Sequence, residues 1–562
     1  MKKNRVSGRF PRSFYVANTM EIFERLAWYG FFTVSSLYMT TPSAHGGLGF
    51  SDQERGFLQG IVPFILYVLP VFTGALADRY GYQRMFILSL LIMGPSYFLL
   101  GQVTSFWTFC AVFTAVAIGA ALFKPIAVGT VGRTTDDNNR GLGFGIFYMM
   151  VNVGGFMGPI IAGYVRAISW DLVFTMSSFW IFINLIPAIF LYREPMKSTR
   201  DERSIGEVFL GAREVLGNAR LLVFVLPLIV TLVVLAKNRD ALLSIAIFVA
   251  CWVAANVAWS FIVSNRKSTK WYLQPIKVGD ANFVTYLLVL SIFWAVYYQV
   301  FLTLPLYIRD FVDTSDLVQS LGGFFPKAVD FIANVNIDHL SEYLSGLHGI
   351  TNTNDTRALH SIKLSLASMN VLVSEAQIHF YLTELRDGKI DTQSLAVQLA
   401  RNHRQIGPEY IINIEFAVII VFQVLVSNIA QRFRSLPVLV CGTFTLALSM
   451  VIVGGADATT GRGFVVLFAV VVFAIAEMIA SPKSQEYVAA VAPQSKTAMF
   501  MGYYFISMAL GNLFGGLLSG WAYSSIAREL NNPMLMWQVF AALASLSALA
   551  LLGLDAWMRR RV

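Results

Sequence analysis

Charged residues are scarce in this chain: only 13% of its 562 residues are Asp, Glu, Lys or Arg, whereas 56% are hydrophobic. A soluble domain carries about 25% charged residues. The scarcity excludes an ordinary soluble protein, and the many apolar runs of about 20 residues predict a polytopic helical membrane protein. The net charge of +9 is not a nucleic-acid signal, because the basic residues gather in loops on one predicted side of the membrane.

Cysteine and histidine are also rare, with three and six residues. The three cysteines lie within predicted helices, so the sequence indicates no disulfide framework. No histidine falls within a predicted span, and any coupling to protons must therefore use carboxylates. The histidines of the longest loop are widely spaced and lack a paired ligand motif such as H-x-x-x-H. We therefore expect neither a metal site nor a cofactor.

Fourteen apolar segments are long enough to cross a membrane, and they fall into groups of six, two and six. Two six-helix halves with a site between them are typical of the major facilitator superfamily, so we expect an all-α fold of this kind. The predicted parts are an N-terminal half (13–193), linkers with an extra transmembrane hairpin (194–282), and a C-terminal half (283–308 and 407–557). The basic loops predict that both termini lie in the cytoplasm.

One connection is far longer than is usual between helices. It comprises residues 309–406 and joins the ninth and tenth spans on the outer side. Its helical periodicity predicts a small helical cap outside the membrane. We hypothesise that this insert contacts the outer gate of the same chain and caps or stabilises it.

Five ionisable side chains lie inside otherwise apolar spans: Glu21, Glu24, Arg25, Lys124 and Glu477. A charge at bilayer depth costs roughly 2.5–3.5 kcal/mol or more, so such residues usually mark a substrate or proton path. The first three are spaced i, i+3 and i+4 and share a helix face, which Tyr29 continues one turn on. These charges indicate a transporter.

The cluster on the first helix suits proton coupling. Arg25 can pair with either carboxylate, and protonation that changes the partner of Arg25 is what a proton carrier needs. Lys124 lies at a similar predicted depth and can pair with these acids or bind an anionic group. A static buried ion pair and a snorkelling lysine remain as alternatives. With Glu477 on the opposite half, the arrangement suits a zwitterionic solute.

Several motifs carry a family resemblance. EIFERLAWYG resembles the ExxER signature of the proton-dependent oligopeptide transporter family. GAALFKP is similar to that family's KP element on the fourth helix, and FGIFYMMVNVGGFMGP to its FYxxxNxG signature on the fifth. AEMIASP contains E-x-x-x-S-P. Each motif is weak alone, but their occurrence together and in order is specific; the resemblance excludes the outer insert.

The resemblance implies inward co-transport of di- and tripeptides with protons. It assigns proton handling to the first-helix cluster together with Lys124. It implies that Glu477 holds the peptide amino group and that Asn152 and Asn413 hydrogen-bond the peptide backbone. The full set of substrate residues that it implies is Arg25, Tyr29, Lys124, Asn152, Gln299, Asn413, Glu477 and Tyr504, the last of which stands where the family often has Trp.

Gating residues are predicted on both sides of the membrane. GALADRYGYQR resembles the superfamily's cytoplasmic loop motif, and we expect Asp78 and Arg84 to form a charge clamp at the inner gate. On the outer side, family members often have an Arg–Glu pair where this chain has Phe32 and Tyr298. We predict that an aromatic contact replaces that ion pair.

Glu415 is a further departure, because the family usually has an apolar residue there. Asn413 and Glu415 are two residues apart, about 200° around a helix, so they do not share a face. We favour an outer-end polar contact for Glu415 over an added proton or substrate site.

The sequence thus predicts a proton-coupled symporter that imports small peptides by alternating access in a bacterial inner membrane, and not an enzyme. Within the transporter class, the alternatives are another peptide-like or zwitterionic solute and drug efflux. A distant alternative makes the insert a sensor or enzyme that the helices anchor. The insert has no nucleophile–base or metal-ligand spacing to support it.

Overall fold

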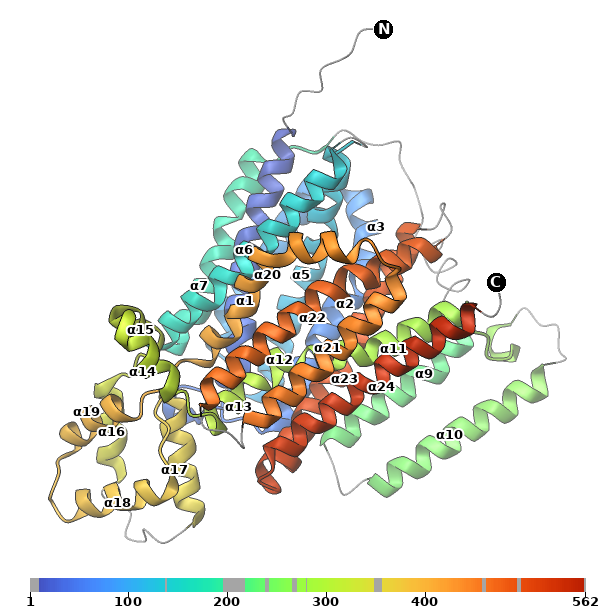
Figure 1. Ribbon diagram of the computed structural model, residues 1–562. Coiled ribbons are helices and arrows are strands. Elements are labelled where there is room, and N and C mark those ends of the chain that lie inside the picture. Colours follow the sequence, from blue (N-terminus) through green and yellow to red (C-terminus); the bar gives the residue numbers. More distant parts are fainter. Residues whose placement is uncertain are drawn as a thin grey trace.

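The fold is helical, as predicted. The computed structural model describes residues 10–136, 139–195, 218–237, 242–264, 270–278, 280–347, 356–456, 461–492 and 497–559. Within these residues the β-structure is an isolated bridge between Val371 and Arg404. Figure 1 shows a bundle of long helices with a smaller helical domain at one end.

The N-terminal part contains the first group of long helices. Ser51 and Glu54 form a capping box that begins the second helix, and a bend of 43° separates it from the third, which starts at Pro70. The helices are α1 (Arg12–Thr40), α2 (Asp52–Val68), α3 (Pro70–Tyr80), α4 (Tyr82–Leu100), α5 (Phe106–Thr134), α6 (Arg140–Arg166) and α7 (Trp170–Ile183), with the short η1 (Ser43–His45) and η2 (Pro187–Leu191).

Two helices, α9 (Ala219–Lys237) and α10 (Leu242–Val263), lie between the halves in sequence, and α10 runs along the edge of the bundle in Figure 1. The first helical segment of the C-terminal part is interrupted twice, so that a 17-residue helix is followed by helices of 4 and 8 residues before the insert begins. The elements are α11 (Ala281–Tyr297), α12 (Gln299–Leu302), α13 (Leu304–Phe311), α20 (Pro408–Ala430), α21 (Ser435–Gly455), α22 (Arg462–Val491), α23 (Thr497–Ala522), η8 (Tyr523–Glu529) and α24 (Pro533–Arg559).

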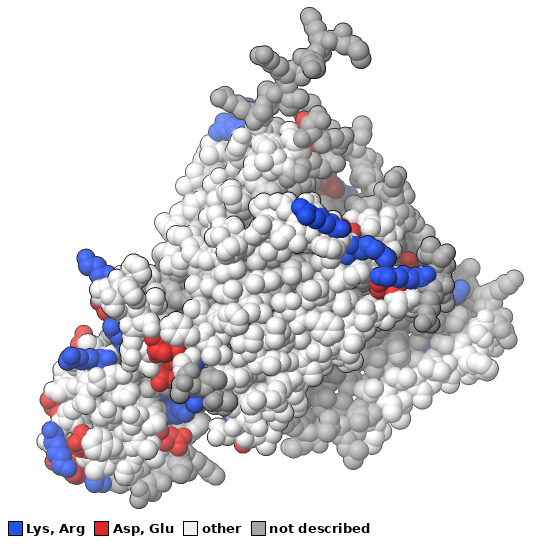
Figure 2. Space-filling model, in the orientation of Figure 1, with Lys and Arg blue, Asp and Glu red and all other residues white. Residues whose placement is uncertain are grey.

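The bundle is an integral membrane structure. Among the residues described, ten helices are long and apolar enough to cross a membrane, and the bent pair α2–α3 adds an eleventh. Helix α1 has 29 residues but carries the buried charged cluster, which lowers its mean hydropathy. Figure 2 shows a broad face without charge between the insert and the opposite end of the molecule. The number of fourteen spans stays a prediction.

The insert forms a helical domain with an apolar core of its own. Leu340, Leu366, Ile378 and Leu395 are buried in this core, which is separate from the core of the bundle. The insert lies at one end of the bundle in Figure 1 and carries many charged residues in Figure 2. Its helices are α14 (Ser315–Phe324), α15 (Pro326–Ile332), α16 (Ile337–Gly346), α17 (Thr356–Ser368), α18 (Glu375–Arg386) and α19 (Thr392–Asn402).

Glycines bring the two halves into backbone contact at the ends on the side of the insert, which is the predicted outer side and is called outer below. A Cβ atom added to Gly516 of α23 would lie 2.5 Å from the backbone nitrogen of Gly60 in α2. A Cβ atom on Gly520 would lie 2.7 Å from the carbonyl oxygen of Asp52. These positions accept no side chain without movement, so the sequence of small residues sets how closely α2 and α23 approach.

Candidate transport site

The charged cluster of α1 is buried at the interface with α6. Glu21, Glu24 and Arg25 are 3%, 1% and 3% exposed. Arg25 Nε donates to Glu24 Oε2 at 2.5 Å and lies 3.3 Å from Glu21 Oε1. Gly154 of α6 leaves the space that the Arg25 side chain occupies. The structure therefore brings the three predicted residues together, with Arg25 shared between two acids.

Lys124 reaches the same region from α5. Its Nζ lies 4.7 Å from the ring centroid of Tyr67 in α2, a cation–π contact. It also acts electrostatically on Glu21, although more weakly than Arg25 does. The guanidinium of Arg25 lies 5.6 Å from the ring centroid of Tyr29. Each of the two cations therefore lies against a tyrosine ring.

Glu477 has an acidic partner, which the sequence analysis placed elsewhere. The carboxyl group of Glu415, on α20, faces the carboxyl group of Glu477 on α22. Glu415 is 1% exposed, and within the described residues the hydrogen-bonding partner of its carboxyl group is the carboxyl group of Glu477 rather than a cation. The preferred outer-end contact for Glu415 is therefore wrong. Asn413 and Glu415 do lie on different faces of α20, as predicted. The face that carries Glu415 packs toward α22 and so belongs to the site.

Tyr29 connects the cationic and acidic sides of the site. Its hydroxyl interacts with Arg25 on its own helix and with both Glu415 and Glu477 across the interface. Tyr297 of α11 interacts with the same two acids and with Tyr29. The two acids therefore lie beside a pair of tyrosines, one from each half.

An aromatic contact between the halves is present, but it uses other residues than those predicted. Tyr29 lies 5.1 Å from Phe416 of α20, ring centroid to ring centroid. Phe32 instead stacks on Trp28 within α1, and Tyr298 packs against Trp294 and its own neighbours. The structure thus places Phe32 and Tyr298 in separate aromatic clusters.

The predicted amide side chains differ in how many of their hydrogen-bonding atoms already have a partner within the protein. Asn413 Nδ2 donates to the carbonyl of Phe156 across the interface at 3.0 Å, which leaves its Oδ1 buried without a partner. Asn152 is half-buried and donates to its own helix. Gln299 is fully buried and donates to the carbonyls of Ala295 and Gly515, so it fastens α12 to α23 in this conformation.

Tyr504 and Tyr148 complete the inner part of the site. Tyr504 is fully buried and its hydroxyl lies 2.9 Å from Ser484 Oγ. Tyr148 of α6 is 55% exposed, and its hydroxyl lies next to Ser481 and Gln485 of α22 and near Glu477. The sequence analysis did not select Tyr148, although the FYxxxNxG motif contains it.

An ion network that sequence reasoning missed closes the outer ends of the two halves. Arg528 lies 3.2 Å from Asp52 of α2 and 3.1 Å from Asp310 of α13. Tyr523 donates to the same Asp310 oxygen at 2.7 Å. Because Asp52 and Asp310 belong to different halves, Arg528 connects them.

Arg55 is the buried centre of this outer network. It is 0% exposed, and its Nη1 donates to the carbonyl of Leu302 at 2.9 Å and to Ser519 Oγ at 3.1 Å, both in the opposite half. Gln59 Oε1 lies 2.9 Å from the same Nη1, so three acceptors share its two N–H groups, and Asp52 lies 3.8 Å from its Nε. Arg55 falls inside the predicted second span, so the rule applied to the other intramembrane charges could have found it.

The cytoplasmic loop motif forms a charge contact within one half. Asp78 lies 2.6 Å from Arg133 at the end of α5 and accepts a hydrogen bond from Tyr82. Glu194 accepts the backbone N–H of Tyr82. Arg84 is exposed. The partner of Asp78 is thus Arg133 rather than Arg84.

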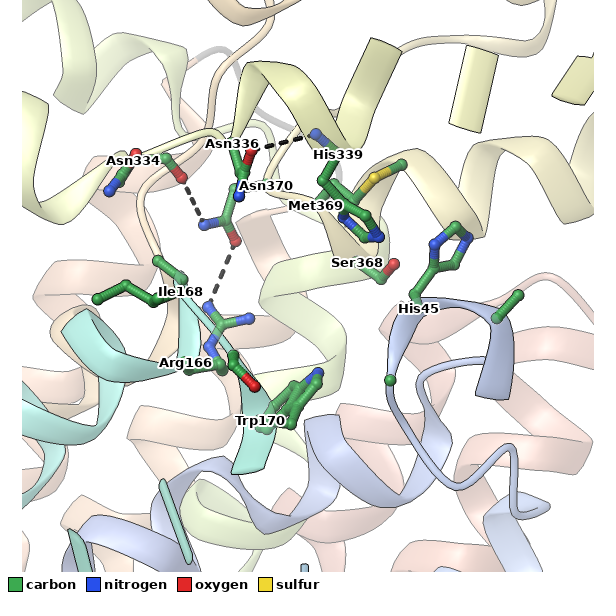
Figure 3. Close-up of a pocket in the computed structure, with 14 residues that line it drawn as sticks. His45, Arg166, Ile168, Trp170, Asn334, Asn336, His339, Ser368, Met369 and Asn370 are labelled. Carbon is green, nitrogen blue, oxygen red and sulfur yellow. Dashed lines mark hydrogen bonds between the residues drawn. The ribbon is translucent and has the colours of Figure 1, made fainter. Parts of the chain in front are cut away.

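The insert contacts the N-terminal half at the outer surface. Arg166 at the end of α6 donates to both Glu409 oxygens, at 2.9 and 3.2 Å, and its Nη2 lies 3.4 Å from Asn370 Oδ1 of the insert. Tyr164 of α6 stacks on Phe331 of α15 at 5.4 Å. Figure 3 shows the hydrogen bond that joins Arg166 to Asn370. Both residues line a pocket of about 290 Å³ between the insert and the N-terminal half.

A histidine pair forms the second contact of the insert. The ring of His45 in η1 lies 5.5 Å from His339 and 4.8 Å from Tyr343, both on α16. Burial, and then the neighbouring His339, lower the pKa of His45 below its usual range. The neutral form of His45 is therefore the one that fits this contact.

Comparisons with known proteins identify a superfamily that the chain matches. The profile of the Major Facilitator Superfamily matches residues 22–333 and 397–562. An uncharacterized transporter, YclF of Bacillus subtilis, is 30% identical over 156 residues, which cover 27% of this chain and 32% of YclF. A dipeptide and tripeptide permease A of Serratia proteamaculans is 25% identical over 182 residues, covering 31% of this chain and 35% of the permease. The alignments thus span about a third of these relatives.

The fold extends over the full length of solved transporters. A POT family transporter in complex with 5-aminolevulinic acid superposes with a TM-score of 0.61 at 18% identity, covering 96% of each chain. The predicted fold is therefore confirmed, and the predicted resemblance agrees with the peptide permease among the relatives. Because its profile match covers most of the sequence, the chain belongs to the major facilitator superfamily.

Proposed function

We propose that this protein is a proton-coupled symporter of the proton-dependent oligopeptide transporter family that imports di- and tripeptides. The observation that carries the proposal is the division of charge across the interface. Arg25 and Lys124 lie on the N-terminal half, and Glu477 lies on the C-terminal half, with Tyr29 between them. A peptide zwitterion carries complementary charges at its two ends.

The same groups supply a route for proton coupling. Arg25 is held by Glu21 and Glu24 in a buried cluster. Protonation of either acid weakens its hold on Arg25, which then becomes available to the peptide carboxylate. An inward proton gradient supplies about 2.3 kcal/mol per charge per 100 mV, in addition to the pH term. Asn152, Asn413 and Tyr504 belong to the proposed peptide site.

Uptake into proteoliposomes tests this function. A pH gradient should drive accumulation of a labelled dipeptide by the wild-type protein, and Glu21→Gln and Glu24→Gln should abolish accumulation while peptide exchange continues. Glu486→Gln is the matched control, because Glu486 lies on α22 with its side chain 51% exposed and pairs with Lys483. Accumulation that persists in both cluster variants would rule out the proposed proton role.

We also propose a bacterial inner-membrane location with both termini in the cytoplasm, and a role for the insert at the outer gate. The support for this role is that Asn370 contacts the Arg166–Glu409 pair, whose members lie on opposite halves. An insert in this position stabilises the outer-closed arrangement. Replacing residues 312–402 by a short Gly–Ser linker should change the uptake rate or the apparent affinity. Unchanged kinetics in a correctly inserted variant would contradict this role.

A further inference from the structure

The carboxyl group of Glu415 has no part in the transport mechanism set out above. It is buried on α20, one residue before Phe416, which contacts Tyr29 across the interface. It faces Glu477, the proposed amine-binding acid. The hydrogen-bonding partner of the Glu415 carboxyl group is that of Glu477, and none of the ion pairs found in the described part of the chain includes Glu415. A buried acid without a cation is costly unless a proton or a ligand compensates it.

We propose that Glu415 and Glu477 together form a doubly acidic subsite that selects peptides whose first residue carries a basic side chain. This inference rests on the proposed peptide transport, and it adds a specificity that Glu477 alone does not give. The subsite would hold the peptide α-ammonium group on one carboxylate and the side-chain cation on the other.

Charge balance favours a ligand with two cations at this end. Two carboxylates that share a buried site repel each other, and this repulsion is relieved when a cation lies against each of them. A single ammonium group balances only one negative charge and leaves the other acid without a cation. A ligand with two cationic groups balances both carboxylates and forms charge-assisted hydrogen bonds to each, which are about twice as strong as neutral ones.

The surrounding residues are suited to this role. Tyr29 and Tyr297 both lie close enough to interact with the two acids. Aromatic rings near a binding site favour a cationic ligand. The arginine and lysine of the N-terminal half lie against Tyr29 and Tyr67, and Arg25 is paired with Glu21. The acid pair therefore lacks a permanent counter-ion and is left for a ligand.

Two isomeric dipeptides provide the test. Lys-Ala and Ala-Lys have the same charges, but only Lys-Ala places its second cation beside the α-ammonium group. The wild-type protein in proteoliposomes should take up Lys-Ala in preference to Ala-Lys. Glu415→Gln should reduce the ratio of the two uptake rates at least tenfold, and Glu415→Leu should do the same. The control Glu486→Gln should keep the wild-type ratio. An unchanged ratio in a folded Glu415 variant would overturn the proposal.

A binding measurement separates this inference from the proposed function. If the wild-type protein transports neither peptide, the proposed function fails, but the subsite can still be tested with simple amines. Pentane-1,5-diamine should raise the unfolding temperature of the purified wild-type protein more than pentylamine does, because only the diamine satisfies both acids. Glu415→Gln should remove the difference. Equal shifts by the two amines in the wild-type protein would overturn the subsite as well.

Discussion

Replacing Arg55 by methionine should open the outer side of the transporter. Methionine has a similar length but removes the charge and all donors of a side chain that is 0% exposed. Its Nη1 donates two hydrogen bonds across the interface, to the carbonyl of Leu302 and to Ser519 Oγ. Both bonds exist only while the outer ends are together.

The expected effect follows from these two contacts. A hydrogen bond from a charged donor contributes about 1.5–3 kcal/mol, so losing both should destabilise the outer-closed state by at least about 3 kcal/mol. Since about 1.4 kcal/mol is a factor of ten, the equilibrium should shift about 150-fold toward the open state. A protein that is closed in 99% of molecules would then be open in more than half of them.

Distance measurements between spin labels check this prediction. Labels at Ala44→Cys and Leu530→Cys, with Cys110, Cys251 and Cys441 replaced by alanine, report on the outer ends of the two halves because both sites are exposed. Arg55→Met should add a population at longer distance. Arg401→Met, on the exposed surface of the insert, is the control. A folded Arg55→Met protein with the wild-type distance distribution would refute the reasoning.

Two further predictions concern the outer side. Gly516→Ala should favour outer opening in the same spin-label assay, because its Cβ would lie 2.5 Å from Gly60, whereas Gly553→Ala should not, since nothing lies within 4 Å of that position. His45 carries a lowered pKa, so the folded protein binds fewer protons there than the unfolded chain, and its contact with α16 should weaken as the pH falls below about 6.5. The hydrogen-exchange protection factors of residues 336–345, which are corrected for the intrinsic pH dependence of exchange, should fall between pH 7.5 and 5.5 in the wild type but not in His45→Gln; an equal fall in both would contradict this.

Hydropathy and motif spacing predicted much of the site. The i, i+3, i+4 spacing correctly placed Glu21, Glu24 and Arg25 on one face, because helical geometry is local and fixed. The depth argument likewise put Lys124 within reach of Glu21. These relations depend on one helix or on distances along the membrane normal, which a single sequence contains.

The contacts that the sequence did not predict join residues on helices that are far apart along the chain. The partner of Glu415 is 62 residues away along the chain, and only the packing of α20 on α22 brings the two acids together. The outer network joins Asp52, Asp310 and Arg528 from three separate segments. Spacing within a motif carries no information on such pairs. The family pattern at Phe32 predicted an aromatic contact in place of an ion pair. The contacts between the outer ends are instead made by Arg55.

The attachment of the insert changes how strong its contacts need to be. Both ends of the insert continue directly into the C-terminal half, at α13 and α20, while Asn370, Phe331 and His339 contact the N-terminal half. The insert thus acts as a tethered ligand, whose effective concentration at its binding surface is in the millimolar range or above. Contacts far too weak to hold a separate partner therefore suffice, and they can release at each transport cycle without the partner being lost.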